Sequence, residues 1–438
     1  MYGPTPADMR RKLILFSADA LVGEDLLLLE RQPAFREALG GGARVRRIRS
    51  IYPTLTYPCH ASIITGTYPE VHAVTSNTLP EPGNPRPLWR WERLHNHCPQ
   101  DLFTQAKAHG YTTASVFWPT TGGHPAVDWL IPEVWPYRPS DTLEAVMERM
   151  GSSREVVQLA SRNWRGRRMD RHPEADEVLV RCACDLIREA EPDVLALHPV
   201  HVDEARHAHG VFHPEVTRAV LDTDRYIGWI LEALEEKKLR DRTCFVLVSD
   251  HGQMDYCRIL RPNVLLREAG LVRCDPEGRV TLWKAWCQGG GMCSPVVLSD
   301  PEDPALVRET LEVLTAMKER EDCGISRVYT REEARLEEHL YGDASFILEG
   351  DGQTAFSENW LPPAMMASPG LEEGERRATH GYHPDRGPQP VFVARGPGFR
   401  EGAFLEEGNL VDEAPTLARV LGFSLPLAQG RPMSTLLE

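Results

Sequence analysis

Hydrophobic residues in this chain cluster into short apolar runs that are separated by longer amphipathic stretches. The apolar runs favour β-strands and fall at residues 13–17, 112–118, 194–198, 244–248 and 391–394. Helical spacing, together with helix start and stop signals, predicts helices at residues 58–65, 100–109, 174–190, 214–237 and 413–421. Strands that alternate with helices predict an α/β fold in which helices cover both faces of a mostly parallel sheet.

This alternation breaks between residues 255 and 370. The stretch holds Gly289-Gly-Gly291, strand signals at residues 294–298 and 344–348, and a helical pattern at residues 304–318. We expect residues 255–370 to form a smaller inserted α+β cap that carries no metal ligand. Residues 1–254 and 371–438 would then form the core of the molecule.

Charge and composition narrow the classes of partner. The net charge is −15, from 49 basic and 64 acidic residues, which argues against nucleic-acid polymers and anionic membranes because both need clustered Lys and Arg. No stretch approaches the about 18 apolar residues of a membrane span, and the apolar run after Arg10 is too short for a signal peptide. The ten Cys show no CxxC spacing, so we expect reduced thiols in a cytoplasmic protein.

Acids and imidazoles lie at or just past the ends of several apolar runs, where open α/β sheets gather their chemistry. They are Asp19, Asp203, His207, Asp250, His251 and His380. Asp203 and His207 are spaced to reach one metal from one helical turn or tight loop. Asp250 and His251 can both act only if the backbone turns there, which Gly252 permits. Three Asp and three His can hold two divalent ions.

The segment before the helix at residues 58–65 offers a nucleophile. Thr56 directly precedes this helix, and its simplest role is that of a helix cap. The same position favours a second role, because unpaired N–H groups at a helix start stabilise an alkoxide and a phosphoryl oxygen. Thr54 and Cys59 compete for this role. We favour Thr56 because only it directly precedes the helix.

Several motifs occur together and in order. They are Tyr52-Pro-Thr-Leu-Thr-Tyr-Pro-Cys-His60 continuing into Thr65-Gly-Thr-Tyr-Pro-Glu-Val-His72, Val246-Leu-Val-Ser-Asp-His-Gly252, and Val391-Phe-Val-Ala-Arg-Gly-Pro-Gly-Phe399. In these motifs the chain resembles the alkaline phosphatase superfamily, and within it the nucleotide pyrophosphatase/phosphodiesterase (type I phosphodiesterase) branch. The resemblance covers roughly residues 11–125, 190–255 and 376–437. It implies an alkaline phosphatase-like three-layer α/β/α sandwich with a smaller inserted cap.

The resemblance also implies roles for these residues. One metal would be bound by Asp19, Thr56, Asp250 and His251, and the other by Asp203, His207 and His380. Asn77 would donate a hydrogen bond to a phosphoryl oxygen. Zn²⁺ is the first choice for Asp and His ligands, with Mn²⁺ or Fe left open.

The sequence departs from the family pattern at positions that would affect the shape of the substrate pocket, while the metal-ligand residues are retained. Cys59 stands where the family often has Asn, and Val202 and Arg206 stand where it usually has Pro and Gly. Arg206 is therefore a candidate phosphate contact. The segment from Cys59 to Ser62 lacks the Pro and Arg of a sulfatase motif, which disfavours that activity.

Together these features predict a two-metal hydrolase that cleaves phosphodiester or pyrophosphate bonds of a small phosphorylated substrate through a covalent phosphothreonine. The alternatives are a phosphonate hydrolase of the phosphonoacetate hydrolase kind, a phosphomonoesterase, and a non-catalytic metal-binding protein. No Lys or Arg adjoins Thr56 or Asn77, which favours diesters. The pocket is expected from residues 76–91, 119–135 and the insert, where Trp118, Trp129 and Trp135 either stack a nucleobase or belong to the core. The leaving group and the oligomeric state stay open.

Overall fold

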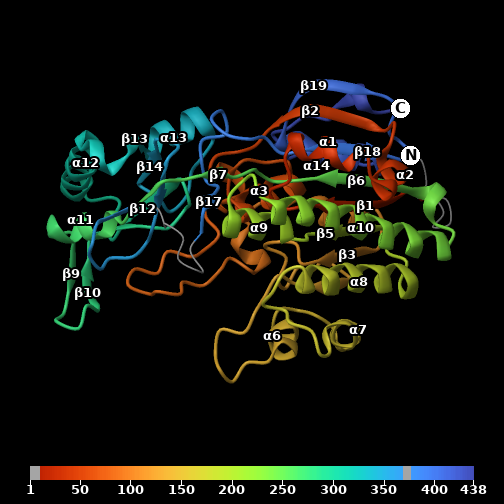
Figure 1. Ribbon diagram of the computed structural model, residues 1–438, viewed down its shortest axis with the longest axis horizontal. Coiled ribbons are helices and arrows are strands. Elements are labelled where there is room, and N and C mark those ends of the chain that lie inside the picture. The colour runs from red at the N-terminus through yellow and green to blue at the C-terminus, as the bar shows by residue number, and fades with distance from the viewer. Residues whose placement is uncertain (1–9, 368–375) are drawn as a thin grey trace.

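An eight-stranded sheet forms the centre of the protein in a computed structural model that describes residues 10–367 and 376–438 (Figure 1). Its strand order is β19-β2-β18-β6-β1-β5-β3-β4. The strands are β1 (Lys12–Ser17), β2 (Ala43–Arg49), β3 (Thr113–Val116), β4 (Trp129–Ile131), β5 (Val194–Leu197), β6 (Thr243–Val248), β18 (Phe392–Arg395) and β19 (Phe404–Asn409). All neighbours pair in parallel except β18, which is antiparallel to both β2 and β6. The predicted α/β fold with a mostly parallel sheet is confirmed.

Both faces of the central strands are buried, and these strands consist mainly of apolar residues. Successive side chains of a strand point to opposite faces, so Ile14 and Phe16 join one hydrophobic cluster while Leu13 and Leu15 join another. The first cluster includes residues of α2 (Pro33–Leu39), α8 (Glu174–Glu189) and α10 (Pro214–Glu236). The second includes residues of α3 (Thr56–Thr65), α5 (Leu102–Ala108) and α14 (Glu413–Val420). Helices therefore cover the sheet on both sides.

Residues 258–367 build a second lobe, at the left of Figure 1. It has a four-stranded antiparallel sheet, β11-β12-β14-β13, and a three-stranded sheet, β15-β8-β16. These strands are β8 (Arg258–Leu260), β11 (Ala285–Cys287), β12 (Cys293–Leu298), β13 (Ile325–Thr330), β14 (Phe346–Gly350), β15 (Thr354–Phe356) and β16 (Met365–Ala367). Its helices include α11 (Pro262–Glu268), α12 (Pro304–Glu319) and α13 (Arg331–Glu338), and a hairpin joins β9 (Val272–Cys274) to β10 (Val280–Trp283). The lobe has its own hydrophobic cluster, and it is called the insert below.

The insert is joined to the core by two connections that lie side by side. The outgoing connection contains β7 (Met254–Asp255), and the returning one contains β17 (Ala378–Thr379). The two strands pair antiparallel, with Met254 opposite Thr379 and Asp255 opposite Ala378. A two-stranded ribbon therefore links the lobes.

Several elements differ from the expectation. The helix predicted at residues 58–65 begins at Thr56, so Leu55 and not Thr56 is the residue that precedes it. Helices α6 (Leu143–Arg149) and α7 (Arg154–Trp164) were not predicted, nor were strands β2 and β19, whose charged residues hide the alternation. Among the described residues, no helix combines the length and the apolar character needed to cross a membrane.

Candidate metal centre and nucleophile

Three neighbouring parallel strands deliver most of the site. Strands β6, β1 and β5 lie side by side, with Phe16 opposite both Leu197 and Leu247. Asp19 follows β1, and Asp250 follows β6. After β5 the chain enters α9 (His201–His209), which carries Asp203 in its first turn. The carboxyl ends of parallel strands meet at one edge, so residues far apart in the sequence converge there.

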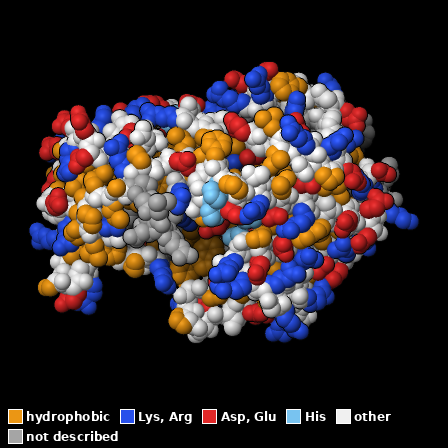
Figure 2. Space-filling view, in the orientation of Figure 1, with side chains coloured by type: hydrophobic (Ala, Val, Ile, Leu, Met, Phe, Trp, Pro, Cys, Tyr) orange, Lys and Arg blue, Asp and Glu red, His pale blue; other side chains and the backbone are white. Residues whose placement is uncertain are grey.

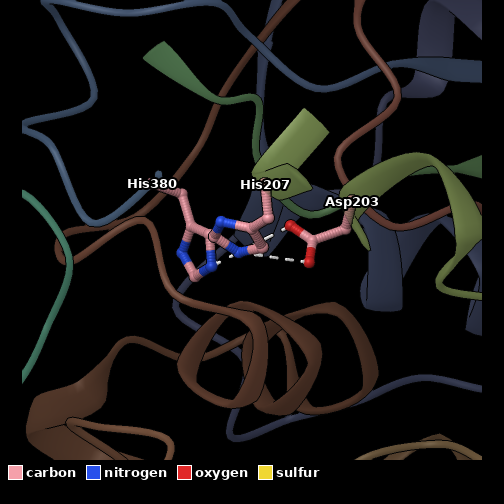
Figure 3. Close-up of side chains that lie close together, drawn as sticks. All are labelled: Asp203, His207 and His380. Carbon is pink, nitrogen blue, oxygen red and sulfur yellow. Dashed lines mark ion pairs between the residues drawn. The ribbon is translucent and has the colours of Figure 1, made fainter. Parts of the chain in front are cut away.

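Asp203, His207 and His380 form one candidate metal group (Figure 3). Their ligand atoms all lie within 4.8 Å of one another, with His207 Nε2 3.3 Å and His380 Nε2 3.9 Å from the Asp203 carboxylate. The Nδ1 atoms of the two imidazoles lie 2.7 Å from the Ala378 carbonyl and 3.1 Å from the Thr54 carbonyl. Hydrogen bonds to these carbonyls fix the rings so that each Nε2 faces Asp203.

Asp19, Asp203 and His251 form a second candidate group. His251 Nε2 lies 3.7 Å from Asp19 Oδ1 and 3.1 Å from Asp250 Oδ2. The backbone bends at Asp250 after the end of β6, and Asp250 Oδ1 accepts hydrogen bonds from the Ala20 and His251 backbone N–H groups. Asp203 belongs to both groups, whereas the sequence assigned it only to the second ion. The two groups therefore adjoin through a shared carboxylate.

The electrostatics of this cluster favour a cation. Asp19 Oδ1 and Asp250 Oδ2 are buried and have no hydrogen-bond partner. Burial and the neighbouring Asp250 and Asp203 carboxylates raise the pKa of Asp19 above its ordinary value, and burial raises the pKa of Asp250 to about 7. A buried carboxylate oxygen that lacks a hydrogen-bond partner is costly unless a cation compensates it. The donor set of Asp oxygens and His nitrogens fits divalent ions such as Zn²⁺.

Thr56 lies at the rim of this cluster. It is the first residue of α3, and its Oγ1 lies 3.2 Å from His251 Nε2. The competing groups are engaged elsewhere. The Thr54 hydroxyl donates to the Tyr382 carbonyl at 2.8 Å, and the Cys59 thiol is fully buried, which raises its pKa. The position of Thr56 is therefore the best suited of the three for attack on a bound substrate.

Asn77 reaches the same helix start from a different segment. Its Oδ1 accepts a hydrogen bond from the Tyr57 backbone N–H at 2.9 Å. This bond directs the amide so that its Nδ2 is left as a donor beside the first turn of α3. Asn77 is thus placed to bind an anion at the same point as the helix N-terminus.

Sequence reasoning assigned no role to several supporting residues. His198 Nε2 lies 3.1 Å from Asp19 Oδ2, and Gln253 Nε2 donates to both the carbonyl and the carboxylate of Asp203. Arg376 Nη1 lies 3.3 Å from His207 Nε2. The sequence offers a weak signal for the first two, because His198 ends an apolar run and Gln253 follows the turn at Gly252. Nothing in the pattern marks Arg376.

The expectation for Arg206 is wrong, whereas Trp118 takes the second of the two roles that the sequence left open. Arg206 is buried, and its guanidinium makes a double hydrogen bond to the Asp25 carboxylate at 2.8 and 2.9 Å, so it is not free to contact a phosphate. Trp118 is fully buried and donates towards the His60 carbonyl, so it belongs to the core. Trp129 and Trp135 are half-buried.

A third group of possible ligands, Glu338, His383 and Asp385, lies apart from this site. Arg49 already lies between its carboxylates, with Nη2 2.9 Å from Glu338 and Nε 2.8 Å from Asp385. The guanidinium supplies the positive charge that an ion would bring. This group is an ion-pair cluster.

Comparison with known proteins agrees with the geometry. The family model for type I phosphodiesterase/nucleotide pyrophosphatase matches residues 13–383. The chain is 26% identical over 256 residues to ectonucleotide pyrophosphatase/phosphodiesterase family member 1 of Mus musculus, a match that covers 55% of this chain and 24% of that protein. It is also 26% identical over 257 residues to venom phosphodiesterase 2 of Crotalus adamanteus, covering 55% and 26%. The chain thus spans about a quarter of the length of these curated relatives.

Solved structures show the same fold. The inactive variant of murine ectonucleotide pyrophosphatase/phosphodiesterase 5 in complex with AMP superposes with a TM-score of 0.68, at 17% identity, over 98% of this chain and 100% of that one. The human protein of the same name gives a TM-score of 0.68 at 18% identity. Because the family model covers most of the chain, this protein belongs to the type I phosphodiesterase/nucleotide pyrophosphatase family.

Proposed function

We propose that this protein is a two-metal hydrolase that cleaves phosphodiester or pyrophosphate bonds in small phosphorylated substrates, with Thr56 as the nucleophile. The observation that carries the proposal is the position of the Thr56 hydroxyl, 3.2 Å from His251 Nε2 and beside two adjoining groups of metal-ligand residues. The family supports phosphodiester hydrolysis.

Two ions would be held by residues of the core. Asp19, Asp250 and His251, with the Thr56 oxygen, suit one ion, and Asp203, His207 and His380 suit the other. When bound, the ions would favour the alkoxide form of the hydroxyl and neutralise charge on the phosphoryl group. Zn²⁺ is the first candidate, with Mn²⁺ or Fe as alternatives.

We infer a reaction in two steps, in which Thr56 first displaces the leaving group from phosphorus and water then displaces Thr56. Thr56 Oγ1 forms a bond to phosphorus while the bond from phosphorus to the leaving oxygen breaks, and the hydroxyl proton passes to solvent. Asn77 Nδ2 and the backbone N–H groups of the first turn of α3 donate to the phosphoryl oxygens as their charge grows. Water next attacks the phosphothreonine, releases the phosphate product and returns Thr56 to its hydroxyl form.

An aromatic cluster beside Thr56 supports a nucleotide-type substrate. Tyr57 follows the nucleophile, its ring lies 5.3 Å from that of half-buried Trp89, and Trp89 lies 5.0 Å from Trp135. Tyr57 is fully buried, so the half-buried Trp89 and Trp135 are the rings of this cluster that could offer a face to a base or another planar group. Figure 2 shows histidine side chains at the middle of this face of the molecule, where the surface is hollowed between the two lobes.

A phosphonate hydrolase or phosphomonoesterase is the second candidate. Arg376 favours it, because a guanidinium 3.3 Å from His207 Nε2 could bind an additional negative charge on the substrate. Rates on a nitrophenyl phosphate monoester, on the nitrophenyl ester of a nucleoside monophosphate, and on phosphonoacetate would separate the candidates. The first candidate requires the diester to have the highest kcat/KM.

The nucleophile is tested with Thr56→Ala. We expect turnover to be lost while the metal content, measured by elemental analysis of purified protein, stays at the wild-type level. Cys59→Ala is the matched control, because it removes the buried competing nucleophile and is expected to keep most of the activity. If Thr56→Ala retains more than about a thousandth of the wild-type rate, the assignment is wrong, because loss of a covalent nucleophile costs far more than that.

A further inference from the structure

A buried carboxylate of the insert reaches into the core next to the candidate site. Glu349 lies on β14 and is only 2% exposed. Its Oε2 accepts a hydrogen bond from the Tyr52 hydroxyl at 2.6 Å, and its Oε1 accepts one from the backbone N–H of His383 at 3.1 Å. Both partners belong to the core, so one side chain of the insert holds two separate core segments.

These two segments are the ones that carry Thr56 and His380. Tyr52 lies four residues before Thr56, in the loop that leads into α3, and His383 lies three residues after His380. Thr54 ties the loops together, because its carbonyl oxygen lies 3.1 Å from His380 Nδ1 and accepts a hydrogen bond from Gly381 N–H at 2.9 Å. Glu349 thus binds Tyr52 in one loop and His383 in the other, and the same two loops carry Thr56 and His380.

The contact between the insert and these loops is tight. The backbone N–H of Met292 donates to the His380 carbonyl at 2.8 Å. A Cβ added to Gly381, whose φ is +88°, would lie 1.9 Å from the Gly290 carbonyl oxygen. The His380 loop therefore has no room to shift towards the insert, and its position depends on where the insert lies.

Few charges surround Glu349. The nearest cationic group is Arg386, whose Nη1 lies 3.9 Å from Oε1, and the His383 ring is engaged by Glu338 at 2.9 Å. Tyr329 and Cys293 complete the cluster around the Tyr52 ring. Burial raises the pKa of Glu349 to about 7. The Tyr52 and His383 hydrogen bonds are therefore its main polar partners.

We propose that Glu349 is a positioning residue, which fixes the Thr56 hydroxyl relative to the His380 imidazole by holding Tyr52 and His383. This inference rests on the proposed function for its kinetic consequences. It gives the insert a role in the geometry of the site, although the insert supplies none of the residues assigned to the metals.

The test compares Glu349→Gln and Tyr52→Phe in the full-length, metal-loaded protein. Each change weakens or removes one hydrogen bond and leaves the size of the side chain nearly unchanged. We expect kcat to fall by about 10-fold or more, as for other outer partners of metal ligands, with a smaller change in KM. Zinc affinity, measured by competition with a chromogenic chelator, should fall as well because His380 is held less firmly. Should Glu349→Gln fail to fold, Tyr52→Phe, which removes a single oxygen atom, carries the test.

Two further variants make the test specific. Tyr329→Phe removes a hydroxyl from the same cluster without touching the Tyr52–Glu349 bond, and it should behave as wild type. The double variant Tyr52→Phe/Glu349→Gln should lose little more than either single variant, because both act through one bond.

The outcomes separate this inference from the proposed function. If the wild type hydrolyses a substrate and both single variants keep kcat and zinc affinity within about two-fold, well inside the expected effect, the positioning role is wrong. If the wild type hydrolyses none of the substrates, the proposed function fails, and zinc affinity alone decides. Unchanged affinity would then overturn the inference, and weakened affinity would support it.

Discussion

His198 illustrates how individual residues outside the ligand set shape the candidate site. It is fully buried, and its Nε2 lies 3.1 Å from Asp19 Oδ2. Burial lowers the pKa of His198 to about 4, so the ring is neutral at pH 7 and can orient Asp19 by a hydrogen bond. The other Asp19 oxygen is left free to face His251.

Replacing His198 by Ala should therefore weaken metal binding without removing a ligand. We expect zinc affinity to fall by about 10- to 100-fold, measured by competition with a chelator. His109→Ala is the control, because His109 is exposed and its ring contacts the Gln105 carbonyl and Phe423, neither of which belongs to the candidate site. Equal zinc affinity in the His198 variant and the wild type would show that the contact between His198 and Asp19 does not contribute to metal binding.

Sequence reasoning located the residues at the centre of the site more readily than their partners. The six acids and imidazoles stand out because each lies at or past the end of an apolar run, or near a motif. Gln253 bears only a weak mark and Arg376 bears none, because they meet Asp203 and His207 only through the tertiary fold. The expectation for Arg206 was wrong for the same reason, since its partner Asp25 is distant in sequence.

At the scale of elements, helix α9 carries two of the candidate ligands, Asp203 and His207. The residue before it, Val200, has no side chain that can cap the helix. Asp176 of α8 supplies the cap instead, because its Oδ1 accepts hydrogen bonds from the backbone N–H groups of Val200 at 2.5 Å and His201 at 3.2 Å. The Asp176 carboxylate is also paired with His172.

Asp176→Ala should lower both stability and metal affinity. Two buried N–H groups lose their acceptor, so we expect the free energy of unfolding to fall by about 1–3 kcal/mol, measured by urea denaturation. Zinc affinity should fall with it, because Asp203 lies in the first turn of α9. Asp303→Ala removes the cap of α12 in the insert and should lower stability by about 1 kcal/mol without changing zinc affinity. A parallel loss of affinity in the Asp303 variant would contradict this account.

The elements that sequence patterns missed share a physical feature. Strand β2 contains four Arg residues, and most positions of β19 are exposed or half-exposed, so neither shows the apolar run of a central strand. The central strands β1, β5 and β6 were predicted because burial on both faces requires uninterrupted apolar residues. The fold was therefore predictable at its centre and less so at its edges.

At the scale of the whole molecule, bound ions should stabilise the folded chain. Ligands of the two groups come from segments as distant as Asp19 and His380, and these segments meet only in the native state. A ligand that binds only the folded form at a concentration of 100 times its Kd adds about 2.7 kcal/mol to stability. We expect a chelator to lower the midpoint of thermal unfolding of the wild type.

The same treatment should leave the midpoint of Asp203→Ala nearly unchanged, because this variant lacks the carboxylate common to both groups. Equal shifts in the two proteins would show that the stabilising ions bind elsewhere.

The ribbon of β7 and β17 has a mechanical consequence. Asp250 and His251 lie just before β7, and His380 lies directly after β17, so both covalent connections of the insert run through candidate ligand loops. Any movement of the insert relative to the core would have to bend this ribbon, because both covalent connections pass through it. Bound ions that join the two loops would oppose such bending, and removal of the ions would ease it. Faster hydrogen exchange in the ribbon after chelation, with unchanged exchange in β1 and β6, would show that ions at the candidate site also hold the two lobes together.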